Sequence, residues 1–171
     1  VSKISFTGST DIGKTVGHAA LDNMTRFSLE LGGKNPMIIF GDVPVDKAIQ
    51  GAIMGGFLNQ GQVCAAASRL YIHRSKFDQV IEGLAAAADS MTVGAGLDVT
   101  AQINPLVSAK QKQSVCRYIE IGKQEGAKVV AGGYAPDLPG YFVRPTVIVD
   151  VDHSKTLVKE EVFGPVLVAM P

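Results

Sequence analysis

Residues 4–15, "ISFTGSTDIGKT", join a strand pattern to a helix pattern through a glycine turn. Residues 3–7 are rich in strand-forming side chains, residues 8–10 are Gly-Ser-Thr, and residues 11–23 predict a helix. Strand and helix patterns alternate over the rest of the chain. This rhythm predicts an α/β fold with a mainly parallel sheet flanked by helices.

The same reasoning gives the later elements. Strands are expected over residues 27–31, 37–40, 69–73, 127–131 and 142–149, and again in the final "EEVFGPVLVAM". The stretch 37–40 has the pattern of a buried strand. A helix is expected over residues 46–58 with Asp46 as its N-cap, a second over residues 77–88 with one apolar stripe, and a third around Val115 and Ile119. Because strand patterns stand at both ends, we expect a piece of a longer protein.

Composition narrows the function classes. The chain has 171 residues, 16 basic and 16 acidic side chains and a hydrophobic content of 46%. No basic patch indicates nucleic acid or an anionic membrane, and no segment is apolar enough to span a bilayer. Two cysteines without a disulfide pattern and no export signal favour the reducing cytoplasm. The three histidines lack metal-ligand spacing, so no metal site is expected.

The stretch 8–15 also satisfies G-x-x-x-x-G-K-[ST], the phosphate-binding loop of nucleotide triphosphatases. Asp11 places a carboxylate in that loop, which is unfavourable beside a triphosphate. The same strand, turn and helix N-terminus form a general anion site that suits the pyrophosphate of a dinucleotide, with Ser9 as an added donor. A simple helix-capping turn is the third alternative. These residues alone leave all three open.

Two side chains stand out chemically. Cys64 follows the polar run "NQGQV", which predicts an irregular and partly exposed segment, whereas Cys116 lies within an apolar helix pattern. Glu30 stands between two leucines in a strand that ends at Gly32, so it is either a surface residue or a base whose pKa burial would raise. A cysteine hydrolase pairing Cys64 with His73 or His153 is an alternative.

Four motifs together resemble the NAD(P)-dependent aldehyde dehydrogenase superfamily. They are "FTGSTDIG" (6–13), "LELGGKNP" (29–36), "FLNQGQVCAA" (57–66) and "KEEVFGPV" (159–166). The resemblance covers all 171 residues, in the same order and at comparable spacing. It implies oxidation of a small-molecule aldehyde to a carboxylic acid with NAD, NADP not being excluded.

The resemblance also implies residue roles. Cys64 matches the nucleophile that forms a thiohemiacetal and then a thioester, and Glu30 matches the general base for deacylation. Five positions match cofactor contacts: Ser9 the pyrophosphate, Leu31 the nicotinamide carboxamide through its carbonyl, Glu161 the nicotinamide ribose, Phe163 the adjacent ring, and Gln111 the ribose.

Organisation and substrate are further implications. Residues 1–31 match the end of the NAD(P)-binding domain and residues 32–171 a catalytic domain truncated at its C-terminal end. The isolated fragment is expected to be inactive, and the parent protein to be a homodimer or homotetramer. The stretches "NQGQVCAAASRLYI" and "AQINPLVS" resemble bacterial phenylacetaldehyde dehydrogenases, which favours an arylacetaldehyde, with betaine-aldehyde-type and aliphatic substrates open.

Overall fold

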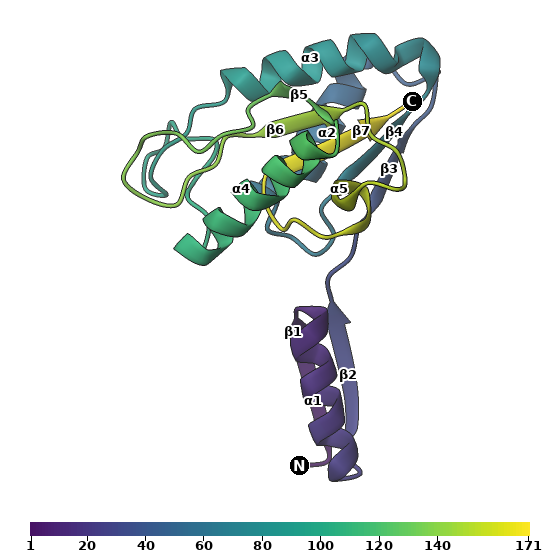
Figure 1. The fold of residues 1–171 in the computed structure, drawn as a ribbon, viewed down its shortest axis with the longest axis vertical. Coiled ribbons are helices and arrows are strands. Elements are labelled where there is room, and N and C mark those ends of the chain that lie inside the picture. The colour runs from purple at the N-terminus through teal and green to yellow at the C-terminus, as the bar shows by residue number, and fades with distance from the viewer. The chain divides into compact units, whose positions relative to one another are not determined.

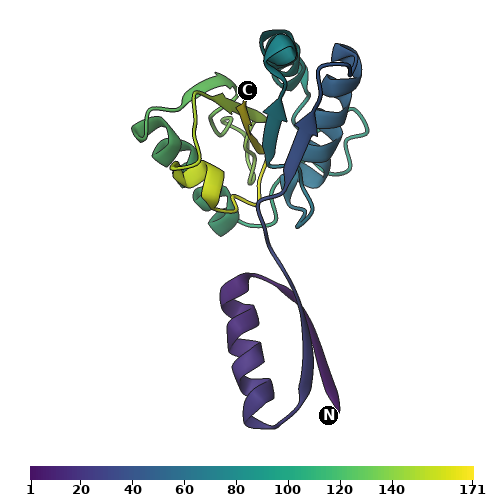
Figure 2. The ribbon, with the colours of Figure 1, turned by 90° about the vertical axis from the view of Figure 1, so that its right-hand side faces the viewer.

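The computed structural model describes residues 1–171, which form two compact units, Val1–Gly33 and Lys34–Pro171 (Figure 1). The first unit contains β1 (Lys3–Gly8), α1 (Thr10–Asp22) and β2 (Arg26–Leu31). The two strands pair in parallel, and α1 packs along them as the crossover between them (Figure 2). This is the strand, turn and helix that residues 4–15 predict.

The second unit is built on a five-stranded sheet. Its strands are β3 (Pro36–Ile39), β4 (Arg69–Ile72), β5 (Lys128–Ala131), β6 (Thr146–Val149) and β7 (Val166–Met170), in the spatial order β3-β4-β7-β6-β5. Four strands run parallel, and β5 pairs antiparallel with β6. The amino ends of β3, β4, β7 and β6 therefore lie along one edge of the sheet.

Helices cover both faces of this sheet. Helices α2 (Val45–Phe57) and α3 (Phe77–Ser90) pack on one face, and α4 (Ala109–Gln124) and the short α5 (Thr156–Lys159) pack on the other (Figure 2). Two 3₁₀ turns, η1 (Leu58–Gly61) and η2 (Arg74–Lys76), follow α2 and precede α3. The predicted α/β fold with a mainly parallel sheet is confirmed.

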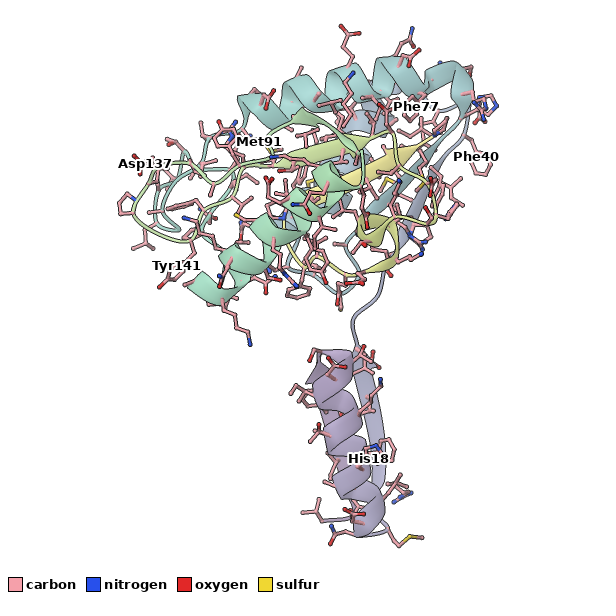
Figure 3. The ribbon with its side chains drawn as sticks, in the orientation of Figure 1. His18, Phe40, Phe77, Met91, Asp137 and Tyr141 are labelled. Carbon is pink, nitrogen blue, oxygen red and sulfur yellow. The ribbon has the colours of Figure 1, made fainter.

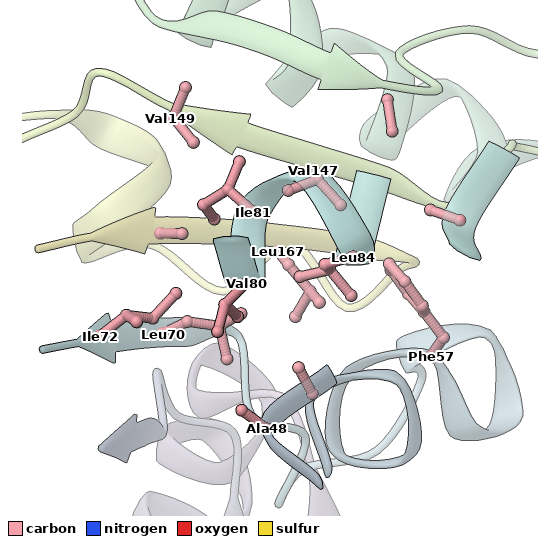
Figure 4. Close-up of a cluster of buried hydrophobic side chains, with 14 of the residues drawn as sticks. Ala48, Phe57, Leu70, Ile72, Val80, Ile81, Leu84, Val147, Val149 and Leu167 are labelled. Atoms are coloured by element: carbon pink, nitrogen blue, oxygen red, sulfur yellow. The ribbon is translucent and has the colours of Figure 1, made fainter. Parts of the chain in front are cut away.

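The central strand β7 divides the core in two. Leu167 (Figure 4) and Ala169 join the cluster under α2 and α3, whereas Val166, Val168 and Met170 join the cluster under α4 and α5. This alternation follows from the two-residue repeat of a strand, and a strand covered on both faces has a continuous apolar sequence. Full burial of a side chain such as Leu167 contributes about 1.5–3 kcal/mol.

Several local expectations were wrong. The stretch 37–40 is not a buried strand, because β3 is an edge strand on which Ile38 is 63% exposed. Phe40, just after the end of β3, is 66% exposed and projects outward in Figure 3. Pro44, not Asp46, is the N-cap of α2. Strand β6 begins only at Thr146, although Phe142 is buried, and α5 was not predicted.

Candidate active site

Cys64 follows a left-handed turn. Helix α2 ends at Phe57, and Asn59, Gln60 and Gly61 in η1 then have φ values of 49°, 56° and 67°. Left-handed backbone at residues other than glycine is unfavourable by about 1–3 kcal/mol each and gathers at functional sites. The turn breaks the helix and leaves Cys64 exposed and unpaired before β4, on the amino-end edge of the sheet.

Side-chain amides fix this turn. Asn59 Nδ2 donates to the Gln62 carbonyl at 3.1 Å, and the Gln62 amide donates back to the Asn59 carbonyl at 3.0 Å. Gln62 Oε1 accepts from the Val107 amide at 3.0 Å, which ties the turn to the segment before α4. The polar side chains before Cys64 therefore serve to hydrogen-bond the backbone of the turn and of the segment before α4. Sequence reasoning missed this role.

The second cysteine is placed differently. Cys116 lies half-buried on α4, and burial raises the pKa of its thiol, with the Lys112 ammonium opposing that shift. The thiolate is the reactive form of cysteine, so a raised pKa makes Cys116 the poorer nucleophile at neutral pH. The exposure of Cys64 thus favours it as the reactive thiol, and the raised pKa of Cys116 disfavours Cys116.

The segment before β7 lies beside the turn that carries Cys64. A Cβ added at Gly61 would lie 2.1 Å from the carbonyl oxygen of Gly164, so the two backbones are in contact. Phe163 next to Gly164 has a left-handed φ of 52°, and the residue is 38% exposed. The second unit therefore brings the loop of Cys64 together with the loop of Glu161 and Phe163.

Helix α4 supports the same segment. Gln111 Nε2 donates to the carbonyls of Val162 at 3.1 Å and Phe163 at 2.8 Å, so the amide that the resemblance assigns to a ribose contact holds the backbone beside Phe163. Tyr118 Oη donates to Glu160 Oε2 at 2.8 Å, which fixes Glu160 against α4. The two neighbouring glutamates therefore differ: Glu160 is exposed and bonded to Tyr118, whereas Glu161 is half-buried.

Lys34 supplies a buried positive charge. Its Nζ is buried without a hydrogen-bond partner at the start of the second unit. Burial, reinforced by the positive charge of Arg69 and opposed by the Glu161 carboxylate, lowers the pKa of Lys34 to about 8. Lys34 and Glu161 therefore interact electrostatically. Sequence reasoning missed Lys34, since an isolated lysine in a glycine-rich turn is usually solvated.

The first unit carries three of the predicted positions. Ser9 is the N-cap of α1, and its Oγ accepts from the Ile12 amide at 3.5 Å. Glu30 and Leu31 lie on β2, where Glu30 is exposed and Leu31 packs so closely on Gly13 that a Cβ there would lie 2.5 Å from it. Cys64, Gln111, Glu161 and Phe163 belong to the second unit.

The triphosphatase alternative does not fit the first unit. Helix α1 begins at Thr10, so only Ser9 separates it from the end of β1 at Gly8. A phosphate-binding loop needs several non-helical residues whose amides point inward before its lysine. Lys14 instead lies within the helix and is exposed.

The cysteine hydrolase alternative fails on position. His73 follows the carboxyl end of β4, where its Nδ1 lies 2.9 Å from Ser75 Oγ, whereas Cys64 precedes the amino end of the same strand. His153 stacks on Tyr71 with ring centroids 5.8 Å apart, and it follows the carboxyl end of β6. Neither histidine is placed to deprotonate Cys64.

Two further features are absent from the structure. No three His, Cys, Asp or Glu side chains lie close enough together to bind a metal ion. None of the helices has both the length and the apolar character that a membrane span requires.

Comparison with known proteins identifies the family of this α/β chain. The chain belongs to the aldehyde dehydrogenase family, whose model, described as "Aldehyde dehydrogenase family", matches residues 1–171. It is 51% identical over its whole length to "Putative aldehyde dehydrogenase DhaS" of Bacillus subtilis (strain 168) and 43% identical to a phenylacetaldehyde dehydrogenase of Pseudomonas fluorescens. In both comparisons the chain spans 34% of the relative's length.

Solved structures agree in fold. An aldehyde dehydrogenase from Bacillus cereus in its NAD+ complex matches all of the chain with a TM-score of 0.98 and 45% identity, over 35% of that protein. A betaine aldehyde dehydrogenase from Staphylococcus aureus in complex with NAD+ matches 99% of the chain with a TM-score of 0.96 and 38% identity, over 34% of that protein. The family resemblance that four motifs indicated is therefore confirmed.

Proposed function

We propose that this chain is part of an enzyme that oxidises an aldehyde to a carboxylic acid with NAD+, and that Cys64 is its nucleophile. One observation carries the proposal. Cys64 is exposed on a left-handed turn whose Gly61 touches Gly164, next to the loop of Glu161 and Phe163. An exposed thiol held on a fixed backbone beside a carboxylate-bearing loop suits attack on a carbonyl.

The thiol chemistry has two halves. The Cys64 thiolate attacks the aldehyde carbon, a C–S bond forms, and the carbonyl oxygen becomes an oxyanion. The Cys64 backbone N–H is the donor that this chain offers to the oxyanion, and one such donor contributes about 3–4 kcal/mol. Loss of hydride from the adduct re-forms the carbonyl and leaves a thioester on Cys64.

Water completes the reaction. We assign Glu30 as the base that takes a proton from water, because its carboxylate is exposed on β2 and free to accept one. The hydroxide equivalent attacks the thioester carbon, the C–S bond breaks, and the carboxylic acid leaves with Cys64 restored as thiolate. Each turnover consumes one aldehyde, one water and one NAD+.

Each unit carries residues that suit a part of a dinucleotide. The N-terminus of α1, capped by Ser9, offers backbone amides to a pyrophosphate. The half-buried Glu161 beside the buried Lys34 ammonium suits ribose hydroxyls, and the exposed Phe163 ring suits the face of a nicotinamide. We assign the Leu31 backbone carbonyl as the contact to the nicotinamide carboxamide. We assign Gln111 Oε1 as a contact to the ribose. Bound NAD+, or NADP+ in its place, would supply the hydride acceptor.

The domain roles follow from these assignments. We assign residues 1–31 to the end of the cofactor domain and residues 32–171 to the catalytic domain. An arylacetaldehyde is our leading substrate, because one relative is a phenylacetaldehyde dehydrogenase and the side chains flanking Cys64 are small. Betaine aldehyde is the competing substrate, since several relatives at 40–42% identity carry that name. We expect the enzyme to be a homodimer or homotetramer.

The test uses the full-length enzyme and a Cys64→Ala variant. The wild type should form NADH with phenylacetaldehyde, and Cys64→Ala should lower kcat at least 10³-fold, because the residual reaction lacks the covalent intermediate (order of magnitude as for other nucleophile deletions). Binding of NAD+, measured by calorimetry, should stay within about twofold of the wild type, because the alanine removes no assigned cofactor contact. The 171-residue chain alone should show no turnover, since it spans 34% of its relatives' length.

Two controls sharpen the result. Cys116→Ala removes the other thiol and should leave kcat unchanged. A substrate panel of phenylacetaldehyde, betaine aldehyde and hexanal then ranks kcat/KM. Retained oxidation in Cys64→Ala with loss in Cys116→Ala would contradict the proposal, and a higher kcat/KM for betaine aldehyde would overturn the substrate assignment alone.

A further inference from the structure

Asn35 connects the start of the sheet to the Cys64 turn. Its side-chain Nδ2 donates to the carbonyl oxygen of Cys64 at 2.6 Å and to that of Ala66 at 3.2 Å. Its own carbonyl accepts from the Arg69 amide at 3.1 Å, beside the first residue pair of β3 and β4. One side chain therefore binds the turn that carries the thiol at two points, from a residue that immediately precedes β3.

The backbone of Asn35 is fixed in turn. Pro36 follows it, and a residue before proline is restricted to extended conformations. Pro36 is also the first residue of β3 and pairs with Arg69 of β4. This pairing fixes the position of the Asn35 α-carbon next to it. The donor is thus held in place before the contact forms, so it loses little conformational entropy on binding the turn.

The contact acts on the reactive residue itself. A hydrogen bond to the Cys64 carbonyl fixes the plane of the peptide group between Cys64 and Ala65, and with it the ψ angle of Cys64 and the direction of its side chain. Two backbone hydrogen bonds hold the segment around that carbonyl: the Ala66 amide donates to the Val63 carbonyl at 2.9 Å, and the Ala67 amide donates to the Gly55 carbonyl in α2 at 2.8 Å.

We infer that Asn35 is the positioning residue for the Cys64 thiol: it holds the Cys64 carbonyl so that the sulfur and the Cys64 N–H keep one orientation toward an incoming carbonyl. The catalytic consequence rests on the proposed function, whereas the effect on the turn does not. Positioning of this kind matters because displacements of about 1 Å can slow an enzyme about a hundredfold.

The chain contains a matched control. Asn104 is half-buried in the same unit, and its Nδ2 also donates to two loop carbonyls, Gly94 and Ala95, each at 3.3 Å. Asn35→Ala and Asn104→Ala therefore delete the same groups in two different places. A merely structural role for Asn35 would give both variants the same behaviour at Cys64.

The first test measures amide hydrogen exchange of the 171-residue chain by mass spectrometry. Asn35→Ala should speed exchange in residues 62–68 at least tenfold and leave residues 94–104 unchanged, and Asn104→Ala should do the reverse. Equal exchange in residues 62–68 for wild type and Asn35→Ala would overturn the inference. So would equal acceleration there by both variants.

An isosteric variant adds a pH readout. In Asn35→Asp an ionised carboxylate would face two carbonyl oxygens, whereas the protonated acid can donate to one of them. Relative to wild type, exchange in residues 62–68 should be fast at pH 8 and return toward the wild-type rate at pH 4, close to the ordinary aspartic acid pKa of about 3.9. A ratio that stays the same at both pH values would contradict a donor role for position 35.

The catalytic consequence is tested in the full-length enzyme. Asn35→Ala should lower kcat at least tenfold with KM for NAD+ within twofold of wild type, and Asn104→Ala should leave kcat unchanged. If Cys64→Ala retains oxidation, the proposed function fails while the exchange result still decides the contact. If Cys64→Ala is inactive and Asn35→Ala keeps its kcat, the positioning role fails alone.

Discussion

The α-carbon of Gly61 faces the carbonyl oxygen of Gly164 so closely that a Cβ at position 61 would lie 2.1 Å from it. The two glycines belong to loops about a hundred residues apart in sequence, one leading to Cys64 and the other into β7. Only glycine permits this approach together with the φ of 67° at position 61. The geometry of the candidate site therefore depends on a contact between two backbones.

This contact predicts a large effect for Gly61→Ala. The substitution combines a strained φ with an overlap that forces one loop to move, so it should lower the free energy of unfolding by about 3 kcal/mol. Gly126→Ala is the control, because Gly126 also has a positive φ, 88°, but open space around its α-carbon. It should cost about 1 kcal/mol. Urea denaturation measures both, and equal losses would contradict the contact.

The two thiols should differ in reactivity. Burial raises the pKa of Cys116, and Cys64 is exposed, so iodoacetamide at pH 7 should alkylate Cys64 at least about tenfold faster. Peptide mapping of the 171-residue chain measures both rates. The Cys116 rate should rise steeply as the pH passes above neutrality. Faster labelling of Cys116 at pH 7 would mean that its thiol is the more reactive one.

Lys34 predicts a pH-dependent stability. Its pKa is about 8 in the folded chain against 10.5 for the free side chain, so the unfolded chain binds more protons between these values. The burial of the charge therefore destabilises the fold fully below pH 8, and this penalty disappears as the pH rises toward 10.5. The nearby Arg69 adds to the penalty and Glu161 reduces it.

The variant Lys34→Met should accordingly stabilise the chain by about 2–3 kcal/mol at pH 7, because it removes a buried ammonium. That gain should shrink progressively at pH 9 and pH 10. Lys47→Met, at an exposed position on α2, is the control and should change stability little at any pH. Urea denaturation across pH 7–10 gives the comparison. A constant effect of Lys34→Met would show that the ammonium is not buried in the folded chain.

The fold could be predicted where the signal is local. The stripes of α3 and α4 and the turn after β1 follow from side-chain periodicity and glycine placement, and they appear as expected. The exposed face of β3 could not be predicted, because Ile38 has the same sequence pattern in an edge strand as in a central one. Strand order is set by pairing between distant segments, so the central position of β7 in the sheet could not be predicted from the sequence either.

The site shows the same division. The exposed Cys64 and the half-buried Cys116 follow from their neighbours in sequence. The roles of Asn35 and Lys34 do not, because each depends on contacts with residues about 30 positions away or more, which only the folded sheet brings near. The segment "GGKNP" carries a local signal, because Pro36 restricts the backbone of the residue before it, but that signal does not say which groups the Lys34 and Asn35 side chains contact.

The central claim is that the thiol of Cys64 carries the acyl group during turnover. The most direct measurement uses full-length Glu30→Gln enzyme mixed with phenylacetaldehyde and NAD+, followed by acid quenching and intact-mass and peptide analysis. The glutamine cannot deprotonate water, so the account predicts a phenylacetyl adduct that accumulates on the Cys64 peptide and is absent from Cys64→Ala. An adduct on Cys116, or NADH formation with no acylated cysteine, would contradict it.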